Sequence, residues 1–171
     1  MLSIRPEQPA DREQVFQVNQ QAFGQPDEAR LVEALHRSPA FIPELSLVAV
    51  DDERVVGHIL LSRVAVRGET TRLEALALAP MAVLPARQRG GVGSALVARG
   101  LAEARRLGHS VVIVVGHSDY YPRFGFVRGE PLGIRPPFEV SPGAFMVLEL
   151  QPDTLSGIRG EVEYPPEFAE L

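Results

Sequence analysis

With 171 residues, 45% of them hydrophobic and 23% charged, the chain has the size and balance of one globular domain. It lacks a secretory signal, cysteine and any stretch of the ~20 apolar residues that span a membrane, so we expect a cytoplasmic protein without disulfides. The net charge of −5 argues against general nucleic-acid binding, and the absence of lysine excludes Schiff-base chemistry on a side chain.

The first part of the chain predicts two helices followed by a β-hairpin. Pro9 suits the start of a helix that ends near Gly24. Apolar residues at helical spacing predict a second helix over residues 27–36. Two runs rich in β-branched residues, 45–50 and 55–66, flank a polar turn and predict a hairpin.

The next part predicts a strand–helix–strand unit. A strand over residues 73–83 contains Pro80, which cannot donate a ladder hydrogen bond, so we expect a bulge or a parting of strands there. Residues 91–107 carry the clearest apolar stripe of a helix. The run 111–115 consists of five β-branched residues, which is typical of a strand covered on both faces and parallel to a neighbour. A last strand is predicted over 145–150, and the acidic tail should lie along the surface or extend a sheet edge.

A glycine-rich segment joins the strand to the best-predicted helix. It reads Gln88, Arg89, Gly90, Gly91, Val92, Gly93 and Ser94. Unpaired N–H groups and the positive dipole end of a helix favour an anion at such a place, and glycines let the backbone approach a ligand. The segment lacks the lysine of nucleoside-triphosphate loops and the spacing of Gly-x-Gly-x-x-Gly. It predicts a phosphate cradle, with a plain strand-to-helix turn as the alternative.

Two motifs make the chain resemble the GCN5-related N-acetyltransferase family. The first is a strand end followed by a loop, Met81-Ala82-Val83 and then Gln88-x-x-Gly91-x-Gly93. The second is an aromatic element, Tyr120-Tyr121-Pro122-Arg123-Phe124-Gly125-Phe126. The likeness extends over most of the chain and is greatest to the bacterial branch called YhbS-like. It implies one α/β (α+β) domain over residues 1–171, with a mixed, mostly antiparallel sheet, a central parallel strand pair and helices on both faces.

The resemblance also implies acetyl-CoA as cosubstrate, without a metal. The backbone of residues 81–83 would hydrogen-bond the pantetheine arm, and residues 88–94 would hold the pyrophosphate. A parting of strands at Pro80 would leave N–H and C=O groups that the pantetheine amides can satisfy. Arg87 and Arg89 are candidates for reaching the coenzyme phosphates, with a solvated surface role as the alternative.

For the chemistry, the resemblance assigns Tyr121 as the acid that protonates the coenzyme thiolate, and a packing tyrosine is the alternative. Some family members carry a glutamate base where this chain has Ala77, and Glu74 should point to the opposite face, so no general base is assigned. His117 follows a strand end and is either a functional group or a polar loop residue.

The function implied is transfer of the acetyl group of acetyl-CoA to an amine by direct attack in a ternary complex. The amine would belong to a small molecule or to a protein N-terminus or side chain. The acceptor would enter a groove formed by the first two helices and the segment 126–145. The alternative is a catalytically silent acyl-CoA sensor or interaction module on the same fold. Neither nucleic acid nor a membrane is expected as a partner. The sequence does not decide between a homodimer and a monomer.

Overall fold

The structure is a computed structural model that describes residues 1–170. The chain divides into two compact units, each assembled from separate segments. Unit 1 comprises Met1–Ser62, Ala79–Glu103 and the segment that begins at Pro166, and unit 2 comprises Arg63–Leu78 and Ala104–Pro165. No helix within residues 1–170 is long and apolar enough to cross a membrane.

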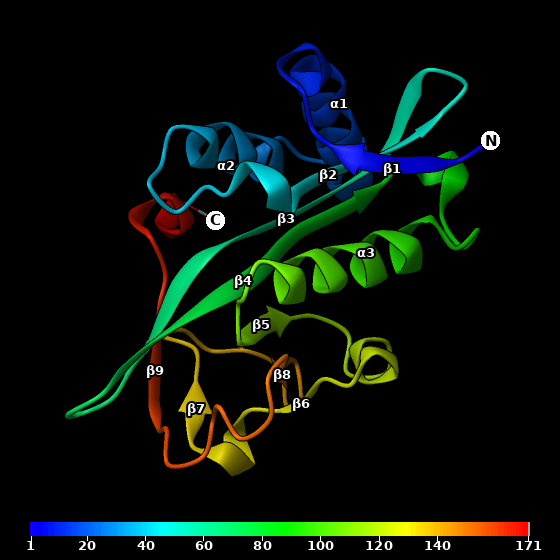
Figure 1. Ribbon diagram of the computed structural model, residues 1–171. Coiled ribbons are helices and arrows are strands. Elements are labelled where there is room, and N and C mark those ends of the chain that lie inside the picture. The colour runs from blue at the N-terminus through cyan, green and yellow to red at the C-terminus, as the bar shows by residue number, and fades with distance from the viewer. Residues whose placement is uncertain (171) are drawn as a thin grey trace. The chain divides into compact units, whose positions relative to one another are not determined.

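Unit 1 combines helices with antiparallel strands (Figure 1). Its elements, two of which continue into unit 2, are β1 (Ser3–Pro6), α1 (Arg12–Phe23), α2 (Asp27–His36), β2 (Ser46–Asp51), β3 (Arg54–Arg67), β4 (Arg72–Val83) and α3 (Val92–Arg106). Strand β2 pairs antiparallel with both β1 and β3, as the predicted hairpin requires. The predicted boundaries are confirmed to within one or two residues, except that α1 begins three residues after Pro9.

Short 3₁₀ helices connect several of these elements. They lie at Pro9–Asp11, Pro43–Leu45, Pro85–Arg87, Tyr121–Phe124, Glu130–Leu132 and Pro166–Glu170. Each carries a proline at its first or second position, where the missing N–H would have no partner in the helix. Proline therefore opens a 3₁₀ turn before α1 instead of α1 itself.

Helices cover both faces of the strands in unit 1 (Figure 1). A Cβ atom at Gly57 in β3 would lie 2.9 Å from Leu96 Cδ1 and 3.0 Å from Val92 Cγ1, both on α3. One at Gly100 in α3 would lie 3.0 Å from Leu61 Cδ1 of β3. Two glycines thus let α3 lie close to one face of β3. Because side chains alternate along a strand, His58 points to the other face, toward α1 and α2.

A buried hydrogen-bond network ties both of these helices to the strands. The His58 ring bonds Asn19 Nδ2 through Nδ1 at 3.2 Å and Ser46 Oγ through Nε2 at 3.0 Å. The Ser46 hydroxyl donates to Glu7 Oε1 at 2.7 Å, and His36 Nε2 lies 2.8 Å from the same oxygen. Since Ser46 has only one proton to give, His58 must donate from Nε2 and accept at Nδ1.

The network fixes the charge of its members. Burial lowers the pKa of His58 to about 4, so the ring is neutral. Burial alone would raise the pKa of Glu7, but hydrogen bonds from His36 and Ser46 outweigh it and lower that pKa overall. A neutral imidazole and a carboxylate therefore coexist in the core of unit 1, and both should make the fold sensitive to acid.

The free energy of unfolding should depend on pH through His58. The unfolded chain protonates His58 near pH 6.5 and the folded chain only near pH 4, so acid favours unfolding over that interval. Between pH 7 and 5 the wild type should lose roughly 2 kcal/mol more unfolding free energy than His58→Gln. Urea denaturation at the two values measures this difference. The exposed His117 provides the control, because His117→Gln should keep the wild-type loss, and equal losses in all three proteins would contradict the assignment.

Unit 2 is built around a parallel strand pair. Its remaining strands are β5 (Val111–Val115), β6 (Val127–Arg128), β7 (Ile134–Arg135), β8 (Phe145–Glu149) and β9 (Gly160–Glu163). Strand β5 runs parallel to β4 and antiparallel to β8, and its first four residues are buried, as its β-branched run predicts. Strand β9 lies in the acidic tail and pairs with β3 and β7, so the tail extends a sheet edge. The mixed α/β fold expected from the sequence is confirmed.

The pairing of β4 with β5 ends before Pro80, near which the sequence predicts a parting of strands. Pairing of β4 with β5 covers Leu76 with Val112 and Ala77 with Ile113, and the described ladder ends there. Pro80 follows Ala77 by three residues. The end of β4 is therefore not engaged in this ladder.

Candidate functional site

The loop between β4 and α3 adopts the backbone that the glycine-rich sequence predicts. Arg89 and Gly91 have left-handed backbones, with φ of 66° and 87°. The first helical hydrogen bond runs from the Ala95 N–H to the Gly91 carbonyl at 3.0 Å. The N–H groups of Gly91, Val92 and Gly93 consequently have no acceptor within the helix. A 15-residue helix adds its positive dipole end at the same point.

The glycines of the loop have different surroundings. A Cβ atom at Gly91 would meet nothing within 4 Å, so open space lies in front of the helix entrance. One at Gly93 would lie 3.2 Å from Met81 Cε and 3.6 Å from Val83 Cγ2, so Gly93 packs against the end of β4. One at Gly90 would lie 3.4 Å from the Arg87 carbonyl. The loop thus combines free N–H groups with room for a ligand, which fits a pyrophosphate.

Gln88 has a role that its place in the motif did not reveal. Its side-chain amide donates to the Val83 carbonyl at 3.0 Å and so ties the loop back to the strand. The Leu84 N–H donates to the Val56 carbonyl of β3 at 2.9 Å. The loop is therefore held at its start from two sides. Of the strand residues predicted to hold pantetheine, Ala82 and Val83 are buried and Met81 is half-buried, as is Ser94 in the helix.

The two arginines proposed for the phosphates differ in their partners. The Arg87 guanidinium makes an ion pair with Asp51 Oδ2 at 2.9 Å. The N-terminal ammonium and Arg87 together hold the pKa of Asp51 below its usual value. Arg89 is exposed and makes no ion pair within the described part of the chain. Arg89 is thus the better candidate for a phosphate contact.

Tyr121, the predicted acid, lies in unit 2 at the start of the 3₁₀ helix Tyr121–Phe124. Its side chain is 8% exposed, and its ring packs edge-on against Tyr120 and Phe126, with centroids 5.0 and 5.6 Å away. Burial, with a smaller contribution from Tyr120, raises the pKa of Tyr121 to about 12. No residue whose side chain the structure describes hydrogen-bonds its hydroxyl. Tyr121 is therefore protonated at neutral pH with a proton to donate.

Sequence reasoning overlooked Gly116, on which the Tyr121 ring rests. A Cβ atom there would overlap Cε2 of that ring. The Gly116 N–H donates to the Ala144 carbonyl at 2.9 Å, which anchors this support to the segment before β8. The sequence signal for this role is a single glycine between the β-branched run 111–115 and the aromatic pair Tyr120-Tyr121. Tyr120 instead contacts Arg123, whose guanidinium lies 4.5 Å from its ring centre, in keeping with a structural role.

The residues considered for the general base lie apart from any recognisable proton relay within the described part of the chain. Ala77 is buried, Glu74 is exposed, and His117 is an exposed loop residue whose carbonyl accepts the Tyr120 N–H at 3.1 Å. Within residues 1–170 no group of three or more His, Asp or Glu side chains could hold a metal ion. The structure thus offers an anion cradle in unit 1 and a phenol donor in unit 2.

Comparisons with known proteins agree with this arrangement. The family described as "Acetyltransferase (GNAT) domain" matches residues 3–129. The chain is 35% identical over 168 residues to the uncharacterized N-acetyltransferase YhbS of Escherichia coli K12, covering 98% of both chains. It is 40% identical over 117 residues to the uncharacterized N-acetyltransferase YjhQ of the same organism, covering 68% of this chain and 65% of YjhQ, slightly under two thirds of that relative.

Solved structures give the same result. The structure is similar to that of E. coli YhbS in complex with CoA, with a TM-score of 0.91, 32% identity and coverage of 98% of this chain and 92% of the other. A GNAT family acetyltransferase from Brucella melitensis in complex with acetyl-CoA has a TM-score of 0.79 and 33% identity, with coverage of 98% of both chains. The motifs, the fold and these relatives agree, and the chain belongs to the GNAT family of acetyltransferases.

Proposed function

We propose that this protein transfers the acetyl group of acetyl-CoA to an amine by direct attack in a ternary complex. The observation that carries the proposal is the entrance of α3, where the N–H groups of Gly91, Val92 and Gly93 lack helical acceptors and open space lies in front of Gly91. These groups would bind the pyrophosphate of the coenzyme. The relatives from E. coli and Brucella melitensis, solved with CoA and acetyl-CoA, support this use of the fold.

The end of β4 would hold the pantetheine arm through its backbone. Because the ladder with β5 ends at Ala77, N–H and C=O groups further along β4 can pair with the pantetheine amides as an added strand would. The Val83 carbonyl is already satisfied by Gln88, so these contacts fall on the other backbone groups of residues 81–83. Arg89 would add a charge-assisted contact to phosphate.

Tyr121 would act as the general acid. The amine nitrogen attacks the thioester carbonyl carbon, the carbon–sulfur bond breaks, and the departing sulfur takes the proton of the Tyr121 hydroxyl. The amine gives up its own proton to water, since no side chain is assigned as base, and water returns a proton to the Tyr121 phenolate, which restores the acid. A pKa of about 12 keeps the phenol protonated at neutral pH, so that it can donate a hydrogen bond and then a proton to the sulfur as negative charge develops there.

The test of this function is thiol release from acetyl-CoA in the presence of amines. A panel of amino acids, polyamines, aminoglycosides and peptide N-termini should contain at least one acceptor that accelerates release well above hydrolysis. One observation favours a catalytically silent acyl-CoA-binding module instead, namely that Ala77 stands where some relatives carry a glutamate base. Binding of acetyl-CoA without release by any amine would establish that second function.

A further prediction addresses the support beneath the proposed acid. Gly116→Ala should push the Tyr121 ring from its place, because the added methyl overlaps it. We expect kcat to fall by about tenfold or more, with KM for acetyl-CoA unchanged, since a displaced acid affects proton transfer more than binding. Steady-state kinetics measures both. Gly125→Ala is the control for strain near Tyr121, because Gly125 has φ of 99° and its Cβ would meet the end of Leu148 at 3.2 Å but not the Tyr121 ring. An unchanged kcat in Gly116→Ala, or an equal loss in both variants, would contradict the assigned support.

A further inference from the structure

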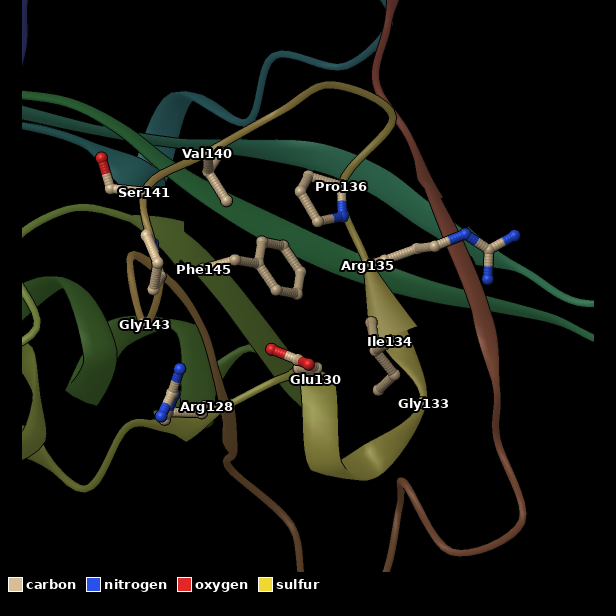
Figure 2. A pocket seen from close by; sticks show the side chains of 11 residues that line it. Arg128, Glu130, Gly133, Ile134, Arg135, Pro136, Val140, Ser141, Gly143 and Phe145 are labelled. Carbon is tan, nitrogen blue, oxygen red and sulfur yellow. The ribbon is translucent and has the colours of Figure 1, made fainter.

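Unit 2 contains a pocket of about 340 Å³ between β6, β7 and the start of β8 (Figure 2). Its floor is apolar, since Ile134 is 1% exposed and Phe145 is 6% exposed. Pro136, Val140 and Pro142 add to the apolar lining. The walls are fixed by backbone bonds from the Gly129 N–H to the Phe145 carbonyl at 3.2 Å and from the Ile134 N–H to the Gly129 carbonyl at 3.1 Å. The pocket is preformed and has the volume that suits a small molecule.

Charged side chains line the rim of this pocket. They are Arg128, Glu130 and Arg135, all exposed. Figure 2 shows the Glu130 carboxylate turned toward the Phe145 ring and the Arg128 guanidinium beside Gly143, whereas Arg135 extends away from the ring. None of the three makes an ion pair with another side chain among residues 1–169. The Glu130 carboxylate and the Arg128 guanidinium therefore lie at the rim of an apolar pocket without forming an ion pair with each other.

The pocket shares a wall with the segment that carries Tyr121. The Ala144 carbonyl, next to Phe145, accepts the Gly116 N–H at 2.9 Å, and Gly116 supports the Tyr121 ring. A Cβ atom at Gly143 would lie 3.5 Å from Ser118 Cβ. A molecule in the pocket thus lies against the same backbone that holds the proposed acid in position.

We propose that this pocket takes the acyl acceptor, and that the acceptor is a compact α-amino acid with an apolar side chain. The inference rests on the proposed function. The floor formed by Ile134 and Phe145 suits the apolar side chain, Arg128 pairs with the carboxylate, and Glu130 attracts the ammonium group before it is deprotonated. Two arginines against one glutamate also disfavour polyamines and other acceptors that carry only positive charge.

Matched pairs of amines test the role of the carboxylate. Leucine is compared with isoamylamine, and phenylalanine with phenethylamine, because each pair differs only by that group. We expect kcat/KM for thiol release to be at least about tenfold higher for the amino acid, the size of one good charge-assisted contact. Arg128→Gln should remove the preference mainly through KM. Arg135→Gln is the matched control and should retain it, since that side chain extends away from the ring (Figure 2).

A binding measurement separates failure of this inference from failure of the proposed function. Leucine should bind the CoA-loaded protein saturably in ligand-detected NMR, and Arg128→Gln should weaken binding about tenfold or more. Turnover of amines without any carboxylate preference would overturn the inference and leave the transferase function standing. Leucine binding without thiol release by any amine would overturn the transferase function and with it the acceptor role, and would leave an amino-acid binding site in the pocket. Absence of leucine binding would overturn the inference whatever the turnover.

Discussion

Gly91→Val should abolish the rise in melting temperature that acetyl-CoA gives the wild-type protein. A ligand at about one hundred times its Kd stabilises the folded state by about 2.7 kcal/mol, which for a chain of this size is a shift of roughly 5–10 °C. Valine at this position enters the open space in front of α3 and also opposes the φ of 87°. The N–H groups of Val92 and Gly93 would then be screened from the pyrophosphate. Differential scanning fluorimetry with and without ligand measures the effect.

Gly108→Val separates lost binding from lost stability. Gly108 follows the other end of α3, has φ of 89° and would likewise place a Cβ with nothing within 4 Å. The conformational free energy that valine costs at this φ therefore matches that of Gly91→Val. The melting temperature of Gly108→Val without ligand should fall by a similar amount. The acetyl-CoA shift should nevertheless persist in Gly108→Val. A shift retained in Gly91→Val, or lost equally in both, would remove this loop from the binding site.

Tyr121→Phe should lower kcat by roughly 10²- to 10⁴-fold, the usual contribution of a positioned general acid. The phenylalanine ring keeps the contacts with Gly116 and Phe126, and its loss of a hydroxyl breaks no hydrogen bond to another described residue. Stability and acetyl-CoA binding should thus stay at wild-type values. The measurement is steady-state thiol release together with the melting shift.

The acid role implies a pH profile without a tyrosine ionisation, and the variants Tyr121→Phe and Tyr120→Phe separate the acid from a packing side chain. With a pKa of about 12, Tyr121 keeps its proton throughout the working range, so its own ionisation should cause no fall of wild-type kcat up to about pH 10. Tyr120→Phe is the matched control and should leave kcat within about twofold of wild type, since Tyr120 is placed to pack against its neighbours. Full turnover in Tyr121→Phe would exclude it as the acid.

The elements whose pattern is local could be predicted from the sequence. Helix α3 has an apolar stripe over four turns, and β5 is a run of β-branched residues, so periodicity alone defines them. The backbone of the glycine-rich loop was also predictable, because Gly91 and Gly93 mark where the chain turns left-handed or packs closely. In contrast β7 has two residues and exists only through pairing with β9.

The features that depend on distant residues could not be predicted. His58 and Glu7 are separated by 51 positions in the sequence. A single histidine and a single glutamate do not indicate that the two side chains belong to one buried hydrogen-bond network. The ion pair of Arg87 with Asp51 depends on how the loop after β4 meets the end of β2. The pocket in unit 2 arises where a connection rich in proline folds over β7 and β8, and its composition resembles that of any surface loop.

The central claim is that the glycine-rich entrance of α3 holds the pyrophosphate of acetyl-CoA. A crystal structure of the complex with CoA tests it most directly. The account predicts phosphate oxygens about 2.7–3.2 Å from backbone nitrogens of residues 91–93, and pantetheine amides paired with residues 81–83. Coenzyme density bound elsewhere on the chain, with these N–H groups bonded only to solvent, would contradict it.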